Sequence, residues 1–159
     1  MLKVLKFGGS SLADADQFRK VAAIINAEPE RRYVVASAPG KRFFEDEKVT
    51  DLLLRCHALA EERNPFEDTF RRIRERFQGI IADLGLELSI DAELNKVEKA
   101  IANGASSDYV ASRGEYFNSM ILASFLGIPF LDAEECIYFT AEGKLDSKKT
   151  NTVLENRLA

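Results

Sequence analysis

The chain has 159 residues, of which 46% are hydrophobic and 30% are charged, a balance that suits one compact domain with a buried core. Its formal net charge of −4 argues against nucleic acid as the main partner, because neutralising phosphates requires a basic surface. The sequence has no apolar run of the roughly eighteen residues that a membrane span needs. It opens with MLKVLKFGG, which lacks the long apolar core of a signal peptide. These features exclude membrane and nucleic-acid partners from our expectations.

The two cysteines, Cys56 and Cys136, are widely separated and lack the spacing of a metal site or a disulfide framework. His57 follows Cys56, but neighbouring side chains on a helix point about 100° apart, so a catalytic Cys–His pair is not expected. We predict reduced, packed cysteines and a cytoplasmic protein.

A strand–helix–strand unit is predicted within the first forty residues. The apolar run 2–7 indicates a buried strand that stops at Gly8-Gly9, and Ser10-Ser11 are candidates to cap the helix that follows. A second strand is predicted over 33–36. The helix between them is indicated by apolar residues at helical spacing, namely Phe18, Val21, Ala22 and Ile25. This order is typical of a parallel sheet.

Helices are expected to dominate after the charged loop 41–48. One begins near Val49, and another is predicted from Asn64-Pro65-Phe66-Glu67, which supplies a cap, a first-turn proline and a capping-box glutamate. The apolar stripe of this second helix is Phe66, Phe70, Ile73, Phe77, Ile80 and Leu84. The arginines that lie off this stripe are interpreted as a solvated face rather than a phosphate patch. They are Arg71, Arg72, Arg74 and Arg76.

Two more helices are predicted over 91–103 and from Ser106-Ser107 to Phe125, each ending at a glycine. Residues 128–131 predict a third strand, 136–139 a possible fourth, and Asp146 or Ser147 the start of a terminal helix. The predicted class is α/β. Because the chain ends without a strand that returns to the sheet, we expect it to be a piece of a longer protein.

The segment Lys6-Phe7-Gly8-Gly9-Ser10-Ser11 carries the first candidate chemistry. Two glycines after a strand let backbone amides approach an anion closely, and a following helix adds its positive dipole end. Lys6 brings a mobile ammonium group to the same point. The pattern suits phosphoryl oxygens, although it matches neither a Walker A loop nor G-x-G-x-x-G, and alone it is also compatible with a plain tight turn.

Two further groups add to it. Ser37 and Gly40 end the second strand, and ligands of parallel sheets bind outside the carboxyl ends of the strands, so these residues should share an edge with Lys6 to Ser10. In the long helix, Glu115 lies on a small polar face, and Gly114 costs about 1 kcal/mol relative to alanine, which indicates a close approach to its backbone. The alternative for this face is simple solvation.

Taken together, four segments resemble aspartate kinases of the amino acid kinase superfamily, in order and approximate separation along nearly the whole chain. They are Lys6-Phe7-Gly8-Gly9-Ser10-Ser11, Ser37-Ala38-Pro39-Gly40, Val49-Thr50-Asp51-Leu52-Leu53 and Ser112-Arg113-Gly114-Glu115. The segment between Gly40 and Thr50 is longer than in many members, and Lys41-Arg42 departs from the common pattern. The resemblance implies a three-layer αβα sandwich with a mainly parallel sheet, of which residues 1–159 form the N-terminal, amino-acid-binding lobe.

The resemblance also implies roles for particular residues. Lys6 would neutralise the phosphate oxygens during transfer, and Gly8, Gly9 and Ser10 would cradle them. Ser37, Thr50 and Glu115 would surround L-aspartate, with Glu115 facing its ammonium group. No metal ligand is implied, since magnesium would arrive with ATP.

The implied reaction makes 4-phospho-L-aspartate from L-aspartate and ATP, the entry to lysine, threonine and methionine synthesis, in an enzyme expected to be a homo-oligomer. The family's nucleotide-binding lobe and regulatory domains have no counterpart in these residues, so we expect the chain alone to be inactive. Two alternatives stay open. One is another amino acid kinase, acting on glutamate, acetylglutamate or carbamate, against which the Ser112–Glu115 motif argues. The other is a non-catalytic binding domain made from this lobe.

Overall fold

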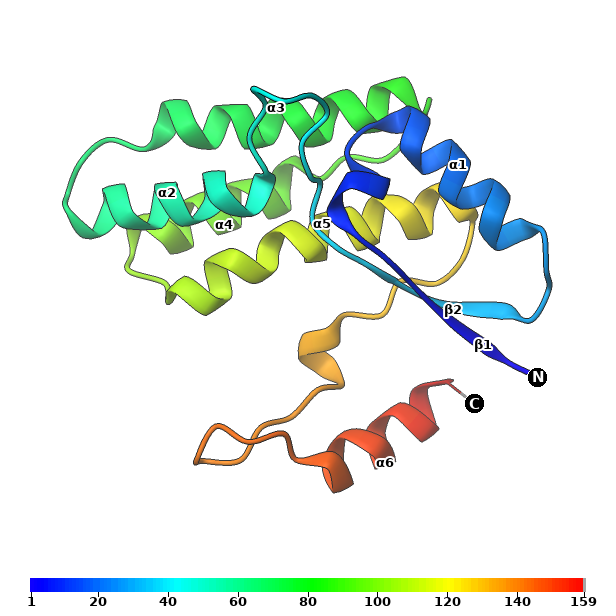
Figure 1. The fold of residues 1–159 in the computed structure, drawn as a ribbon. Helices are drawn as coiled ribbons and strands as arrows, with labels where there is room; N and C mark the ends of the chain where they lie inside the picture. Colours follow the sequence, from blue (N-terminus) through cyan, green and yellow to red (C-terminus); the bar gives the residue numbers. More distant parts are fainter. Residues whose placement is uncertain (159) are drawn as a thin grey trace. The chain divides into compact units, whose positions relative to one another are not determined.

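The computed structural model describes residues 1–158, which divide into two compact units. The first unit spans Met1–Ile128 and the second begins at Pro129. The elements of the first unit are β1 (Lys3–Phe7), α1 (Ala15–Asn26), β2 (Arg31–Ala36), α2 (Val49–Glu61), α3 (Glu67–Asp83), α4 (Asp91–Ala102) and α5 (Ser107–Leu126) (Figure 1). The second unit contains α6 (Ser147–Leu158).

The predicted strand–helix–strand unit is present. β1 and β2 pair in parallel, with Leu5 opposite Val34 and Phe7 opposite Ala36, and α1 connects them. The helix cap differs from the prediction. Ser10 and Ser11 lie in a short 3₁₀ turn, Gly9–Leu12, and the side chain of Asp14 caps α1 by accepting a hydrogen bond from the Gln17 amide at 3.0 Å. The extra turn after the glycines displaces the start of the helix.

The core of the first unit is made mostly by the predicted apolar stripes of the helices. Phe77 of α3 and Phe117 of α5 are fully buried, with ring centroids 5.3 Å apart. Other side chains with no exposed surface come from every helix of this unit, and they include Phe18, Leu53, Phe70, Ile73, Leu94 and Ile121. α2 packs against both α3 and α5. The Val49 amide at its start donates to the Pro39 carbonyl, so the N-terminus of α2 lies beside the loop that follows β2.

The ends of two helices show one success and one error. Ser106 caps α5 through the Tyr109 amide, and Gly127 ends it with a φ of +66°, as predicted. The predicted capping box of α3 is wrong, because the helix begins at Glu67 with Phe66 in the cap position and no side-chain cap bond. Burial of Phe66 against the core outweighs the local capping preference of Asn64.

The two later strands were also predicted wrongly. The Ile128 amide donates to the Ala123 carbonyl at 3.0 Å, so this residue completes the turn that ends α5. In the second unit, the amides of Cys136 and Ile137 both bond back to the Ala133 carbonyl, forming a turn. The Tyr138 amide bonds instead to the Thr150 hydroxyl of α6. Residues 128–131 pair with no strand among residues 1–158, and of residues 136–139 only Phe139 forms a bridge, an isolated antiparallel one with Leu145.

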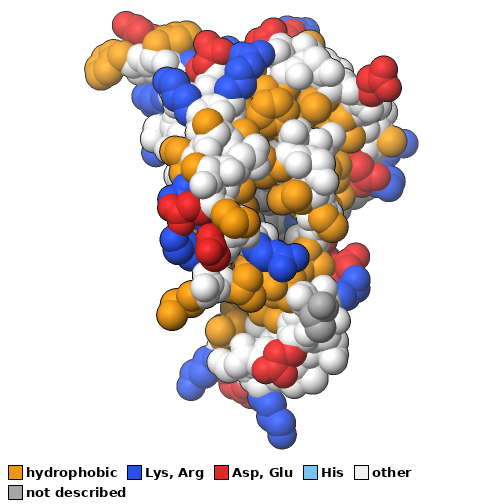
Figure 2. All heavy atoms as spheres, turned by 90° about the vertical axis from the view of Figure 1, so that its right-hand side faces the viewer, with side chains coloured by type: hydrophobic (Ala, Val, Ile, Leu, Met, Phe, Trp, Pro, Cys, Tyr) orange, Lys and Arg blue, Asp and Glu red, His pale blue; other side chains and the backbone are white. Residues whose placement is uncertain are grey.

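The two-stranded sheet is covered on one face and exposed on the other. Leu5, Phe7 and Val34 pack against the helical core, whereas Val4 is 71% exposed and Val35 is 53% exposed. Figure 2, viewed from the side where the N-terminus lies in Figure 1, shows exposed hydrophobic side chains among charged ones. The expectation that the first strand is buried is therefore wrong within residues 1–158. The α/β class is confirmed.

Candidate functional site

The loops that follow β1 and β2 touch each other through their backbones. The Gly40 amide donates a hydrogen bond to the Gly9 carbonyl at 2.8 Å. A Cβ added at Gly40 would lie 2.6 Å from the Gly9 carbonyl carbon, and one at Gly9 would lie 2.8 Å from the Ala38 oxygen. Neither position has room for a side chain. The predicted meeting of these loops at one edge of the sheet is thus observed, and it depends on both glycines.

Helix α5 holds the Ser37–Gly40 loop from another side. A Cβ at Gly114 would lie only 2.6 Å from the Ala38 side chain, so the close approach predicted at Gly114 is that of Ala38. The side chain of Asn118, fully buried one turn further on, donates to the Ser37 carbonyl at 2.7 Å. Asn118 lies three residues after Glu115, so the two residues share one face of α5, and that spacing was the signal in the sequence of a role here.

A pocket of about 430 Å³ opens where these elements meet. Its lining is Gly9, Ser10, Ser37, Ala38, Pro39, Gly40, Lys41, Lys48, Thr50 and Glu115. The predicted residues Gly9, Ser10, Ser37, Thr50 and Glu115 are therefore brought together. They bring hydroxyl groups and one carboxylate to the lining, which also includes two residues that sequence reasoning missed, Lys41 and Lys48. The Lys41 ammonium donates to the Phe44 carbonyl at 3.3 Å.

Two of the predicted residues do not line this pocket. Gly8 directly precedes the glycine that does, and Lys6 lies two residues earlier on β1 with an exposed side chain. No ion pair of Lys6 is formed with any carboxylate of residues 1–158.

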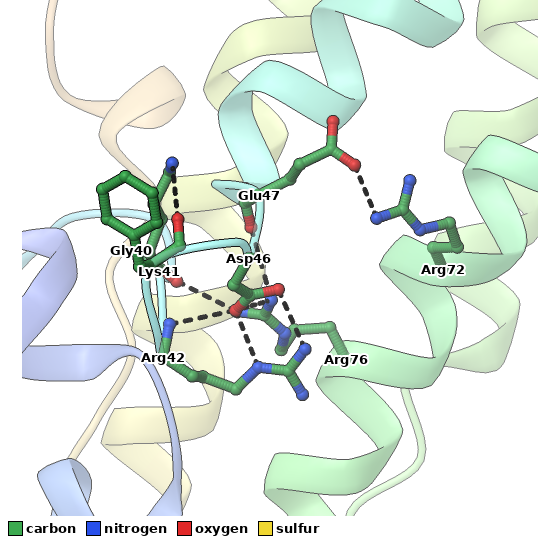
Figure 3. A network of polar contacts seen from close by, with 8 residues as sticks. Gly40, Lys41, Arg42, Asp46, Glu47, Arg72 and Arg76 are labelled. Carbon is green, nitrogen blue, oxygen red and sulfur yellow. Dashed lines mark hydrogen bonds and ion pairs between the residues drawn. The ribbon is translucent and has the colours of Figure 1, made fainter.

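The charged segment 41–48 is folded around Asp46, whose carboxylate is buried (Figure 3). Arg42 donates to that carboxylate from its backbone amide at 2.9 Å and from its guanidinium at 2.8 and 3.0 Å. Arg76 of α3 donates to it at 2.6 Å. The segment is closed where it began, since the Val49 amide donates to the Pro39 carbonyl at 3.1 Å.

Arg76 corrects the expectation that all four arginines of α3 form a solvated face. Its side chain is only 5% exposed, because it lies three residues after Ile73 and four before Ile80, on the flank of the apolar stripe. That spacing was a signal in the sequence. Burial lowers the pKa of Arg76. The hydrogen bonds from Arg42, together with the positive charge of Arg76, hold the pKa of Asp46 far below its ordinary value of 3.8.

The hydrogen bonds of Asp46 predict how the stability of the fold should change with pH in the acid range. A carboxyl group whose pKa is depressed by folding contributes stability that is fully present above its unfolded pKa and is lost as the pH falls below it. Between pH 7 and about 5 the contribution of Asp46 should be constant, and it should decline steadily below the ordinary value of 3.8. We expect Asp46→Asn to lower the free energy of unfolding at pH 7 and to make it less dependent on pH below 4.

Urea unfolding at pH 7, 5, 4 and 3 measures this effect. Asp16→Asn is the matched control, because Asp16 is 81% exposed in its pair with Arg19 and exposed pairs contribute little. Equal pH dependence in Asp46→Asn and wild type would contradict the prediction.

The remaining features add little chemistry. Cys56 and Cys136 are buried free thiols, and burial raises the pKa of Cys56 to about 12, so its thiol is unreactive at neutral pH. Within residues 1–158, no three His, Cys, Asp or Glu side chains are grouped to hold a metal ion. In the same residues, none of the helices combines the length and apolar character needed to cross a membrane.

Two glycine-bearing loops at the carboxyl ends of parallel strands thus meet beside a helix that carries a carboxylate, which is the place where ligands bind in open α/β sheets. The model of the amino acid kinase family matches residues 1–158, and the chain belongs to that family.

Particular relatives narrow the comparison to aspartate kinases. The crystal structure of Clostridium acetobutylicum aspartate kinase is 47% identical with a TM-score of 0.95, and the match covers 99% of this chain and 36% of that one. Aspartokinase 3 of Bacillus subtilis is 35% identical over 139 residues, 84% of this chain and 31% of that protein. Escherichia coli aspartokinase III, solved with aspartate and ADP, shares the fold at 22% identity and a TM-score of 0.76, covering 99% of this chain and 38% of that one. The chain thus spans about a third of the length of these relatives.

Proposed function

We propose that this chain forms the aspartate-binding part, and some of the phosphate-binding part, of an aspartate kinase. The reaction transfers the γ-phosphoryl group of ATP to the side-chain carboxylate of L-aspartate, giving 4-phospho-L-aspartate and ADP. The observation that carries the proposal is the pocket that Glu115 lines together with Ser10, Ser37 and Thr50, beside the Gly9–Gly40 contact. The names of the Clostridium and Bacillus relatives support the choice of aspartate.

The composition of the pocket suits an amino acid with a second carboxylate. Glu115 is the only carboxylate in the lining, so it would pair with the substrate ammonium. The hydroxyl groups and the ammonium groups of Lys41 and Lys48 would receive the substrate carboxylates. Substrate and pocket then have complementary charges at both ends, which a neutral or purely cationic ligand would not match.

The chemistry asks for charge stabilisation rather than proton transfer. The attacking carboxylate is ionised at neutral pH, so its oxygen forms the bond to the γ-phosphorus without a general base, and the bond from that phosphorus to the bridging oxygen breaks. The obstacle is repulsion between anions. Lys6 and the amides of the Gly8–Ser10 turn would offset it, and Mg²⁺ would enter with the nucleotide and screen the phosphates.

Acceptor specificity tests the proposal. Because the chain spans about a third of its relatives, turnover is measured on the full-length protein that carries it. A coupled assay of ADP release is run with L-aspartate, L-glutamate, N-acetylglutamate and carbamate. We expect turnover with aspartate and little with the others. A preference for another acceptor would replace the proposed substrate, and no turnover with any acceptor would favour a binding domain. Lysine, threonine or methionine added to the assay would probe the pathway in which we place the enzyme.

Glu115→Gln is expected to weaken the use of aspartate while leaving the fold intact. The side chain is exposed on α5, so the change removes its charge without disturbing the core. Losing a charged partner for the ammonium should cost about 1.5–3 kcal/mol, which corresponds to a rise of roughly 10- to 150-fold in KM for aspartate.

Steady-state kinetics at saturating ATP measure the effect, and circular dichroism checks the fold. Glu87→Gln, which removes an exposed carboxylate outside the pocket lining, is the matched control. If both variants show the wild-type KM, Glu115 does not contact the substrate.

A further inference from the structure

Arg76 is a buried cation that reaches both ends of the 41–48 segment from a neighbouring helix. Its guanidinium donates to the Gly40 carbonyl at 3.0 Å, to the Asp46 carboxylate at 2.6 Å and to the Glu47 carbonyl at 3.3 Å. Figure 3 shows these groups converging between the segment and α3. A planar guanidinium can hold several acceptors in fixed directions, so one side chain ties the start of the segment to its end.

Stability alone is a poor reason for this arrangement. Removing charges from water is costly, and well-packed apolar residues often replace a buried ion pair without loss of stability. An apolar side chain at position 76 would, however, leave the Gly40 carbonyl without the partner that fixes its direction. The position that the network gives to the segment therefore explains its presence better than the stability that it adds.

The groups that Arg76 fixes are continuous with the pocket. The same residue whose carbonyl it holds, Gly40, uses its amide to bind the Gly9 carbonyl at 2.8 Å. Lys41 and Lys48, at the two ends of the segment, both line the pocket. A change in the position of Gly40 would therefore reach the first glycine loop and the two ammonium groups together.

We propose that Arg76 is a positioning residue for the substrate pocket: through the Gly40 carbonyl and Asp46 it sets the place of the Gly9–Gly40 contact and of Lys41 and Lys48. The inference rests on the proposed function, since it names a residue that acts on that pocket without contacting the substrate. The proposal gives a function to the charged segment 41–48, whose sequence departs from the common family pattern.

The test uses Arg76→Ala in the full-length protein that carries this chain. Loss of hydrogen bonds from a charged group should raise KM for aspartate about 10- to 100-fold, while kcat changes no more than a few-fold because the reacting atoms are untouched. A hollow of about 250 Å³ beside the network, lined in part by Arg42, Asp46, Arg72 and Arg76, gives small cations access to the vacated position. Millimolar guanidinium should therefore restore most of the affinity, and ammonium or sodium at the same concentration should not.

Arg71→Met, which removes an exposed arginine on the same helix, is the matched control and should behave as wild type. If Arg76→Ala does not fold, Arg76→Lys carries the test, because a single ammonium cannot hold Gly40 and Asp46 together and an intermediate KM is expected. An unchanged KM in the folded variant, or a raised KM that guanidinium does not lower, would overturn the inference. Failure of the proposed function would appear in the wild type itself, as absence of aspartate-dependent ADP release, whereas failure of the Arg76 role would appear only in the variants.

Discussion

Lys6→Met is expected to lower kcat by about 100- to 1,000-fold, the range seen when one group that stabilises transition-state charge is removed. Lys6 stands two residues before the glycine turn, on the strand whose end meets the pocket, and its side chain is exposed. It lies outside the pocket lining, so it should contribute little to aspartate binding. Its charge would count most as negative charge shifts during phosphoryl transfer, so kcat should fall while KM for aspartate changes little.

The measurement is steady-state kinetics in the full-length protein that carries this chain, with aspartate and ATP varied separately. Lys20→Met removes the same charge from an exposed position of α1, and it should leave both constants unchanged. A Lys6→Met enzyme with kcat within a few-fold of wild type would make Lys6 a structural residue only.

Gly40→Ala should damage both stability and substrate binding. The added Cβ would lie 2.6, 2.8 and 2.9 Å from the Gly9 carbonyl carbon, the Ser10 nitrogen and the Gly9 oxygen, all backbone atoms that cannot rotate away. Either loop must then move, and the hydrogen bond between them is lost. We expect a loss of about 1–3 kcal/mol in the free energy of unfolding, as for an overpacked site. Because the moving atoms form the pocket wall, KM for aspartate should rise as well.

Gly79→Ala provides a control with the opposite sign. A Cβ at Gly79 would meet nothing within 4 Å, and the residue lies inside α3, where alanine is favoured over glycine by about 1 kcal/mol. Thermal unfolding of the two variants should therefore shift in opposite directions. Equal or higher stability of Gly40→Ala would show that the two loops do not need their close contact.

Local sequence signals predicted the parts of the fold whose cause is local. Apolar spacing predicted the buried face of α3 correctly, and the glycines after α4 and α5 predicted where those two helices end. One part of the site was also predicted from the order of elements in the chain. Residues that follow two parallel strands lie at the same edge of the sheet, so the loops after β1 and β2 were expected to meet. This rule correctly predicted that Ser37 and Gly40 lie close to the Gly8–Ser10 turn. The roles proposed for these residues in catalysis stay predictions.

The features that were missed depend on long-range contacts. Residues 128–131 have the composition of a strand, but a strand needs a neighbour, and here the amide of Ile128 serves the end of α5. Arg76 belongs by composition to a charged face, yet its partners are 36 and 30 residues away in sequence. No local sequence pattern predicts a hydrogen-bond partner at such a distance along the chain. What the sequence does hold is the spacing of Arg76 from the apolar stripe, which indicates partial burial.

The hydrogen bond from the Val49 amide to the Pro39 carbonyl has a consequence for variation in length between related proteins. This bond closes the charged segment into a loop whose two ends lie next to each other. Residues can therefore be inserted into or deleted from the loop without moving α2, the helix that carries Thr50. Lengthening such a loop costs little chain entropy, since the cost grows only with the logarithm of its length. Related proteins can therefore differ in the length of segment 41–48, which contributes Lys41 and Lys48 to the pocket lining, while Thr50 keeps its position at the start of α2.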